Sequence, residues 1–178
     1  MATAIRALAQ RVRLAAFDVD GTLNDGTLVY PGEGHEPKRF HVQDGLGIKL
    51  LPGFGIATAI ITARESQAVA VRARELGVAH LVQGAGDKRA SLDRIASGLG
   101  LAPEQCCFMG DDLTDLGAMA FSGFAVAPAN AHPWVRQRAH WVTPSAGGAG
   151  AARELCDLLL EAQGHADAVL ARFLPDAG

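Results

Sequence analysis

The chain has 178 residues and a mass of 18.5 kDa, which suits one α/β domain and is too short for two of ordinary size. Hydrophobic residues make up 49% of it and charged residues 20%, so a sizeable core can form and disorder as the dominant state is excluded. Lys plus Arg number 16 and Asp plus Glu 19, and the formal charge of −3 offers no broad basic surface for nucleic acid or acidic membranes.

The N-terminal sequence predicts neither export nor insertion into a membrane. The apolar stretch that follows the first arginines is broken by Asp18 and Asp20, so it forms no secretory apolar region of about 7 to 15 residues. No run of about 18 or more apolar residues is present. The three cysteines, of which Cys106 and Cys107 are adjacent, cannot form a framework of disulfides. We therefore expect a cytoplasmic protein that binds neither membrane nor nucleic acid.

Short apolar runs alternate along the chain with longer amphipathic stretches. The predicted strands are 14–18, 56–61, 81–83, 106–109, 124–126 and 141–143. The predicted helices are 45–51, 66–76, 88–99, 113–121, 133–138 and 151–161. Strands without polar alternation are typical of a parallel sheet covered by helices on both faces. We predict one Rossmann-like, three-layer α/β domain over residues 1–178, with a core of about 14–163, a tail of 164–178 and no cap domain.

The segment 26–42 departs from this alternation and predicts a β-hairpin that projects from the edge of the sheet. Its two arms flank a Pro-Gly-Glu-Gly sequence, and the pair Lys38 and Arg39 is interpreted as a solvated face. An apolar hairpin face is expected to be covered by another copy of the chain rather than by water, although it could also pack back on its own domain. The residues of this face are Leu28, Val29, Tyr30, Phe40 and Val42.

Acidic residues follow two of the predicted strands. Asp18 and Asp20 lie at the end of the first strand, and Asp111, Asp112 and Asp115 follow the fourth. In a doubly wound sheet, ligands bind at the carboxyl ends of the strands, so these carboxylates are expected at one rim. Gathered carboxylates repel one another unless a cation is present, and oxygen ligands suit Mg²⁺. The sequence therefore predicts a Mg²⁺ site.

Two further residues extend this rim to a phosphoryl-binding site. Thr62 ends the second predicted strand, and Lys88 begins the helix after the third. A hydroxyl, an ammonium and a Mg²⁺ ion that face a carboxylate can bind a phosphoryl group. A carboxylate can also act as the nucleophile and pass through an aspartyl-phosphate.

Several of the candidate residues have a structural interpretation beside the functional one. Asp112 is a candidate N-cap for the helix that follows it. Asp25 and Asp44 are candidates for turn or cap residues as well as for groups on the substrate side. His132 precedes a proline and is interpreted as structural, helping to start the next helix.

Together, these motifs resemble those of the haloacid dehalogenase superfamily in order, spacing and position on the strands. The resemblance covers about residues 14–163, and its motifs are 18–22, Thr62, Lys88 and 110–115. Within the superfamily, the sequence is similar to the capless 3-deoxy-D-manno-octulosonate 8-phosphate phosphatases. The stretches that carry this closer similarity are 25–26, 40–49, 60–64, 130–133, 146–148, 153–160 and 162–164.

The resemblance implies a role for each acidic residue of the rim. Asp18 would attack phosphorus and bind Mg²⁺ through its other oxygen. Asp20 would protonate the leaving alkoxide and then activate water, with its backbone carbonyl on the metal. Asp111 would be the second carboxylate ligand. Asp115 would hold a metal-bound water or Lys88 and, like Asp112, would lie outside the first shell of ligands.

The resemblance also implies a set of groups that bind the substrate. Thr62 and Lys88 would hold the phosphoryl oxygens, and Lys88 would also compensate the charge of Asp18. The remaining members of the substrate-binding set are Ala63, Arg64 and Asp25.

The sequence departs from this family at three positions. Ala63 stands where the family usually has glycine, and Gln43 and Ala149 stand where it usually has arginine. Because a guanidinium binds a carboxylate with two hydrogen bonds, losing two arginines predicts weaker recognition of a sugar acid.

The function implied by the resemblance is Mg²⁺-dependent hydrolysis of a small phosphorylated metabolite. The leading substrate is 3-deoxy-D-manno-octulosonate 8-phosphate, of lipopolysaccharide sugar biosynthesis. A nonulosonate 9-phosphate or phenylphosphate, as for relatives that are small subunits of phenylphosphate carboxylases, stays open, as does a non-catalytic assembly subunit. The resemblance further implies a homotetramer, in which the tail from Gly164 could reach a neighbouring site.

Overall fold

The computed structural model describes residues 3–29 and 37–174, which form a six-stranded parallel sheet between two layers of helices. The order of the strands is β3-β2-β1-β4-β5-β6. The strands are β1 (Leu14–Phe17), β2 (Ala57–Ile61), β3 (His80–Val82), β4 (Cys106–Met109), β5 (Phe124–Ala127) and β6 (Trp141–Val142). The predicted α/β class and parallel sheet are confirmed. The strand order reverses between β1 and β4, which places the ligand crevice of such a sheet at their carboxyl ends.

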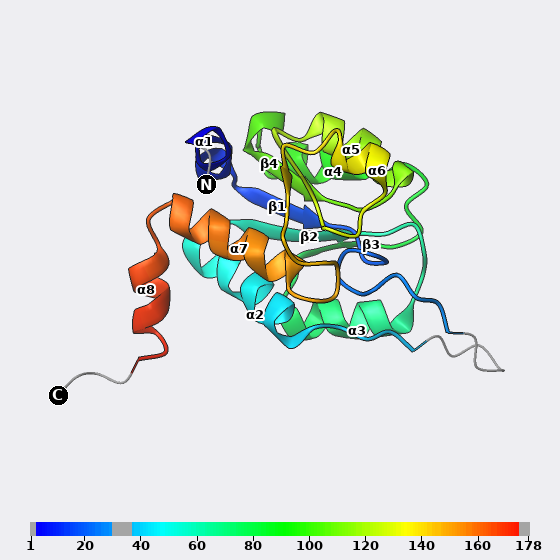
Figure 1. Cartoon of the computed structure of the whole chain (residues 1–178), viewed down its shortest axis with the longest axis horizontal. Helices are drawn as coiled ribbons and strands as arrows, with labels where there is room; N and C mark the ends of the chain where they lie inside the picture. The colour runs from blue at the N-terminus through cyan, green and yellow to red at the C-terminus, as the bar shows by residue number, and fades with distance from the viewer. Residues whose placement is uncertain (1–2, 30–36, 175–178) are drawn as a thin grey trace.

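Helices cover both faces of the sheet (Figure 1). On one face lie α2 (Val42–Leu50), α3 (Gln67–Leu76) and α7 (Ala151–Ala162), and α1 (Thr3–Arg11) packs against α7. On the other face lie α4 (Lys88–Gly98), α5 (Leu116–Phe121) and α6 (Pro133–Arg136). Short 3₁₀ turns are η1 (Leu51–Phe54), η2 (Pro103–Gln105) and η3 (Leu113–Asp115). Within the described residues, no helix has the length and apolar character needed to cross a bilayer.

The central strand shows why the sequence lacks polar alternation. Ala15 and Phe17 of β1 belong to the apolar cluster under α2, α3 and α7, whereas Leu14 and Ala16 belong to the cluster under α4 and α5. All four side chains are fully buried. A strand that packs against helices on both faces has no position left for a polar side chain, so its sequence is a continuous apolar run.

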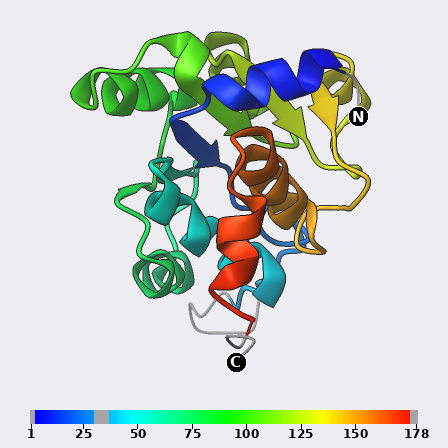
Figure 2. The same cartoon turned by 90° about the vertical axis from the view of Figure 1, so that its left-hand side faces the viewer.

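Two helices were not predicted, and both lie near the ends of the chain. In α1, Ile5, Leu8 and Ala9 pack into the core at helical spacing. The second, α8 (Ala166–Ala171), follows Gly164, lies beyond the carboxyl end of α7 (Figures 1 and 2) and packs against the core through Val169. It is held by Arg172, whose guanidinium lies 4.2 Å from the ring centre of Phe54. Because η1 leads into the amino end of β2, this end of the tail packs far from the carboxyl ends of the strands.

The described arms of the predicted hairpin carry no β-bridge, so the hairpin prediction is wrong for residues 26–29 and 37–41. The tip, 30–36, lies outside the described residues, and with it Tyr30 of the predicted apolar face. The arms are extended coil that projects beyond the carboxyl ends of the strands (Figure 1). Val29 and Val42 are exposed, but Phe40 packs inward against the core, so the apolar face is divided.

Candidate active site

The site residues lie where strands end and helices begin. Asp18 follows β1, and its backbone N–H donates to the Met109 carbonyl at the end of β4 (2.9 Å). Thr62 follows β2, and its N–H donates to the Val82 carbonyl of β3 (2.9 Å). Lys88 is the first residue of α4. These backbone bonds extend the sheet by one residue, so the side chains are fixed by the scaffold.

Lys88 lies at the centre of the site and contacts two carboxylates. Its Nζ lies 2.7 Å from Asp18 Oδ1 and 2.5 Å from Asp115 Oδ1, and all three side chains are nearly fully buried. Burial disfavours the charged form of Lys88, but the attraction of Asp18 and then of Asp115 outweighs it, so the pKa of the ammonium is raised. One cation therefore faces two buried carboxylates.

The excess of negative charge contributes to the raised pKa values of two of the carboxylates. Burial, and then the charge of Asp115, raises the pKa of Asp18 to about 8, although Lys88 acts in the opposite direction. Burial and Asp115 likewise raise the pKa of Asp111 to about 6. A protonated carboxyl group is a poor nucleophile, so a further cation is needed to keep Asp18 ionised at neutral pH.

The donor set fits a hard divalent cation. Carboxylate oxygens of Asp18, Asp111 and Asp115 lie within 4.8 Å of one another. Asp115 is already engaged, because its Oδ1 pairs with Lys88 and its Oδ2 accepts from the backbone N–H groups of Asp111 and Asp112. Asp18 and Asp111 are thus the carboxylates that suit Mg²⁺, and Asp115 holds the loop that carries Asp111.

Gly21 is required for the approach of the first loop to Asp111. Its φ is +92°, a conformation that favours glycine, and a Cβ atom there would collide with the Asp111 carboxylate. The next residue, Thr22, donates from Oγ1 to Asp111 Oδ1 (3.1 Å). The loop after β1 is thereby tied to the loop after β4.

Asp20 is held by one of its two oxygens. Its Oδ1 accepts from Asn24 Nδ2 (2.7 Å) and from Lys38 Nζ (2.6 Å). Its Oδ2 is buried, and no described residue donates a hydrogen bond to it; Arg64 Nε is 3.8 Å away. The Lys38 side chain is only 3% exposed, so the prediction of a solvated lysine is wrong.

The turn after β2 places three predicted residues at the rim. Thr62 is buried, and its Oγ1 accepts weakly from Arg64 N–H (3.4 Å). Ala63 and Arg64 are exposed, and Arg64 extends toward Asp20. The structure therefore brings Arg64 to the same edge as the carboxylates, with its side chain 42% exposed.

The residues with a possible structural interpretation take structural contacts. Asp112 caps η3 by accepting from Leu113 N–H (2.8 Å), and Asp44 caps α7 by accepting from Arg153 N–H (2.8 Å). His132 Nδ1 accepts from Trp134 N–H at the start of α6. Asp25 is exposed and accepts from Thr27 N–H (2.9 Å), a bond that lowers its pKa. A substrate contact for Asp25 stays a prediction.

Sequence reasoning missed two asparagines that shape the site. Asn24 Oδ1 accepts from the N–H groups of Gly21 (3.1 Å) and Gly26 (2.8 Å), so it closes the turn that carries Asp20. Asn130 donates to the Gly21 carbonyl (3.2 Å) and accepts from Gly147 N–H (2.7 Å). Asn24 had a local signal, because asparagine is frequent in tight turns. Asn130 lies in the stretch 130–133 that carries the family similarity, but it is 109 residues from Gly21 and no local pattern assigned it a contact.

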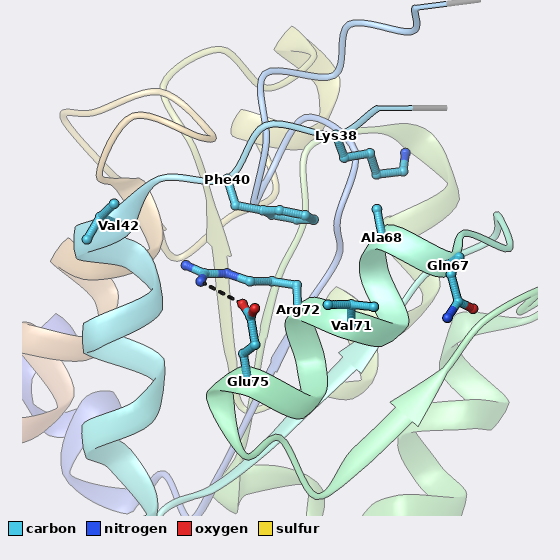
Figure 3. Close-up of a pocket in the computed structure, with 8 residues that line it drawn as sticks. All are labelled: Lys38, Phe40, Val42, Gln67, Ala68, Val71, Arg72 and Glu75. Atoms are coloured by element: carbon cyan, nitrogen blue, oxygen red, sulfur yellow. Dashed lines mark hydrogen bonds and ion pairs between the residues drawn. The ribbon is translucent and has the colours of Figure 1, made fainter. Parts of the chain in front are cut away.

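A groove of ≈ 420 Å³ adjoins the site between the segment 37–41 and α3 (Figure 3). Lys38 lies at one end of the groove and Glu75 toward the other, with the Phe40 ring above the Arg72 side chain. The remaining lining residues are Val42, Gln67, Ala68 and Val71. The groove thus presents apolar walls beside the buried ion pair of Lys38 and Asp20.

The chain matches known proteins over most of its length. A family model described as haloacid dehalogenase-like hydrolase matches residues 56–155. The 3-deoxy-D-manno-octulosonate 8-phosphate phosphatase KdsC of Escherichia coli K12 is 45% identical over 161 residues, which cover 90% of this chain and 86% of that protein. The enzyme of the same name from Yersinia pestis is 44% identical over 87% of this chain and 83% of its own length.

Solved structures show the same architecture. A 3-deoxy-D-manno-octulosonate 8-phosphate phosphatase from Moraxella catarrhalis, in complex with magnesium, phosphate and KDO, has a TM-score of 0.95 at 42% identity. The match covers 98% of this chain and all of that one. A hypothetical protein from Xanthomonas campestris also has a TM-score of 0.95, at 48% identity over 98% of this chain and 96% of its own.

Proposed function

The chain belongs to the haloacid dehalogenase-like hydrolases, within the family of 3-deoxy-D-manno-octulosonate 8-phosphate phosphatases, and from this we propose that it hydrolyses that sugar-acid phosphate with Mg²⁺ as its cofactor. The observation that carries the proposal is the buried cluster of Asp18, Lys88 and Asp115, with Asp111 beside it. Such a cluster is costly to bury, and it provides a nucleophile, a compensating cation and a metal site at one point.

In the first step, Asp18 is the nucleophile. One of its carboxylate oxygens forms a bond to phosphorus while the bond from phosphorus to the leaving oxygen breaks, giving an aspartyl-phosphate. Lys88 and the Thr62 hydroxyl donate to the phosphoryl oxygens and hold the group in line. The buried Lys88 ammonium, carried by the first residue of α4 and paired with Asp18, supports this role.

Asp20 transfers the protons. It gives a proton to the leaving oxygen in the first step, and in the second it accepts a proton from the water that attacks phosphorus and releases Asp18. Its Oδ2 suits this work, because Oδ1 is occupied by Asn24 and Lys38 while Oδ2 has no described donor.

Asp18 and Asp111 are the carboxylates that would hold Mg²⁺, together with the backbone carbonyl of Asp20. The bound ion supplies positive charge to the phosphoryl oxygens and to the crowded carboxylates. The raised pKa values of Asp18 and Asp111 in the metal-free site support this assignment.

The choice of substrate rests on the family to which the chain belongs. Two sequence positions favour testing a broader range of phosphomonoester substrates. Gln43 and Ala149 are both exposed and stand where the resemblance leads us to expect arginine. A phosphatase of the same chemistry for another small phosphomonoester is therefore the second candidate, with a nonulosonate 9-phosphate or phenylphosphate as its substrate.

A phosphate-release assay on the purified protein tests the proposal. We expect Mg²⁺-dependent release from 3-deoxy-D-manno-octulosonate 8-phosphate, with a larger kcat/KM than for a nonulosonate 9-phosphate, phenylphosphate or p-nitrophenyl phosphate. A large preference for phenylphosphate would overturn the sugar-acid assignment. Release from none of these substrates with Mg²⁺ present would favour the non-catalytic assembly subunit.

We also propose that the protein is a cytoplasmic homotetramer that serves lipopolysaccharide sugar biosynthesis. Leu28, Val29 and Val42 are exposed along the segment that crosses the site, and a neighbouring copy would cover them. The described tail, held beside Phe54, packs far from its own carboxylate cluster, which supports a role toward another copy. A mass near 18.5 kDa by light scattering at micromolar concentration would contradict the tetramer.

A further inference from the structure

We propose that Lys38 is a positioning residue that fixes Asp20 for proton transfer, an inference that rests on the proposed phosphatase function. The Lys38 ammonium lies 2.6 Å from Asp20 Oδ1, and its side chain is 3% exposed. Asp20 is 19% exposed, so the pair is largely removed from water although it lies at the rim of the site.

The two oxygens of the Asp20 carboxylate have different contacts, and this difference suits a positioning role for Lys38. Asn24 and Lys38 both donate to Oδ1, one from the same loop and one from a segment 18 residues away in sequence. Two donors on one oxygen fix the rotation of the carboxylate, which a single contact leaves free. The other oxygen, Oδ2, is buried, accepts no hydrogen bond from a described residue and has Arg64 Nε 3.8 Å away, so it is the oxygen left for the reacting groups.

Burial of the Lys38 ammonium argues for function rather than for stability alone. An ion pair taken out of water gains little net stability, because the desolvation of both charges offsets their attraction. A lysine on an extended segment could extend into solvent at little cost, as its neighbour Arg39 does. The fold instead directs Lys38 inward onto the carboxylate that moves protons.

Phe40 provides the anchor that directs Lys38 inward. The segment 37–41 has no strand pairing to hold it, but the Phe40 ring packs against the core and lies over Arg72, whose guanidinium carbon is 5.8 Å from the ring centre (Figure 3). In an extended chain, alternate side chains share a face, so burying Phe40 turns Lys38 to the same side and Arg39 outward.

The consequence for the reaction depends on the leaving group. A sugar alkoxide leaves slowly unless a proton is delivered to it, whereas p-nitrophenolate is stable as an anion and leaves without one. Asp20 is thus needed in the first step for the sugar phosphate more than for the aryl phosphate. Substituting a residue that positions Asp20 must therefore lower activity more for the sugar phosphate than for the aryl phosphate. Substituting a residue that supports the fold or binds the phosphoryl group must lower activity equally for both.

The test compares kcat/KM for 3-deoxy-D-manno-octulosonate 8-phosphate and p-nitrophenyl phosphate, because this constant covers the chemistry up to the departure of the leaving group. We expect Lys38→Met to lower it about 10- to 100-fold more for the sugar phosphate than for the aryl phosphate, a part of the effect of general acid catalysis. Lys38→Arg keeps a donor near Oδ1 and should recover much of the loss. Arg39→Met, the exposed neighbour, should change neither constant.

A double-variant cycle completes the test. In an Asp20→Asn background there is no proton to position, so adding Lys38→Met should change kcat/KM for the sugar phosphate by less than about twofold. Equal losses on both substrates, or full additivity with Asp20→Asn, would overturn the inference. If Lys38→Met is unfolded at the assay temperature, the ratio of kcat/KM for the two substrates is measured on Lys38→Arg instead. Failure of the unmodified protein to hydrolyse either substrate would instead overturn the proposed function.

Discussion

Two buried lysines contact the loop after β1, and each holds one carboxylate of the pair Asp18 and Asp20. Lys88 contacts Asp18 from the first turn of α4, with Asp115 of the β4 loop on its other side. Lys38 contacts Asp20 from an extended segment that has no strand or helix of its own. The proposed nucleophile is therefore held by the regular scaffold, and the proposed acid–base group by an extended segment.

The difference shows which parts of the site are fixed independently of one another. Around Lys88, every partner lies next to a strand or a helix end, and backbone bonds of the sheet set the distances. Around Lys38, the position depends on the packing of Phe40 and on the hydrogen bonds of Asn24. We expect changes near Lys88 to affect metal binding, stability and catalysis together, and changes near Lys38 to affect proton transfer with a smaller loss of stability and no loss of metal binding.

The largest expected effect is on the nucleophile. Asp18→Asn should lower phosphate release from any substrate by about 10⁴-fold or more, because an amide oxygen is a poor nucleophile and the covalent route is lost. Asp20→Asn should cost about 10²- to 10⁴-fold on the sugar phosphate. The fold should persist in both, as judged by circular dichroism. Near-normal turnover by Asp18→Asn would show that Asp18 is not the nucleophile.

The dependence on Mg²⁺ should distinguish the two adjacent acidic residues after β4, Asp111 and Asp112. Chelation should abolish phosphate release and Mg²⁺ should restore it, because the carboxylates need a hard cation. Asp111→Ala should weaken Mg²⁺ binding and lower kcat by about 100-fold or more. Asp112→Ala removes the cap of η3 and should cost about 1 kcal/mol of stability with little change in the Mg²⁺ requirement. If Asp111→Ala and Asp112→Ala weakened Mg²⁺ binding equally in titrations, the assignment of Asp111 as the metal ligand would be wrong.

The free energy of unfolding compares the two lysines directly. Lys88→Met leaves two buried carboxylates without their cation and should destabilise the protein by about 3–5 kcal/mol. Lys38→Met leaves Asp20 with Asn24 and should cost about 1–3 kcal/mol. Lys49→Met, on the exposed face of α2, is the control and should change stability by less than about 0.5 kcal/mol. Urea unfolding measures all three, and a smaller loss for Lys88 than for Lys38 would contradict the comparison.

The pH dependence of stability is the smallest effect. The pKa of Asp18 is about 8 in the folded, metal-free site and 3.8 in the unfolded chain, so the folded state holds the extra proton between these values. Stability in chelator should therefore fall as the pH rises from about 4 to about 8. Asp18→Asn removes this loss, so the stability of the variant relative to the parent should rise between pH 5 and pH 8. Thermal melts at both pH values check this, and an equal gain at both would refute the raised pKa.

The sequence by itself determined the scaffold and the motifs on it. Apolar runs such as 106–109 predicted buried parallel strands because a strand covered on both faces carries no polar positions, and β4 has these bounds in the structure. The placement of Asp18 and Asp111 at one rim followed from topology alone, since parallel strands end at the same edge. The cap of Asp112 was local and could be predicted from the residue type. The role of each carboxylate came from the resemblance to a family.

Only the tertiary structure decided what reaches the rim from elsewhere in the chain. Lys38 and its exposed neighbour Arg39 carry the same charge, and the sequence alone does not show that Lys38 is buried against a carboxylate. Asn130 joins Gly21 and Gly147 through contacts more than a dozen residues apart in sequence, for which no local pattern exists. Regular elements repeat a local rule, so sequence periodicity predicts them. Crossing segments are placed by single long-range contacts, and these exist only once the sheet and its helices have packed.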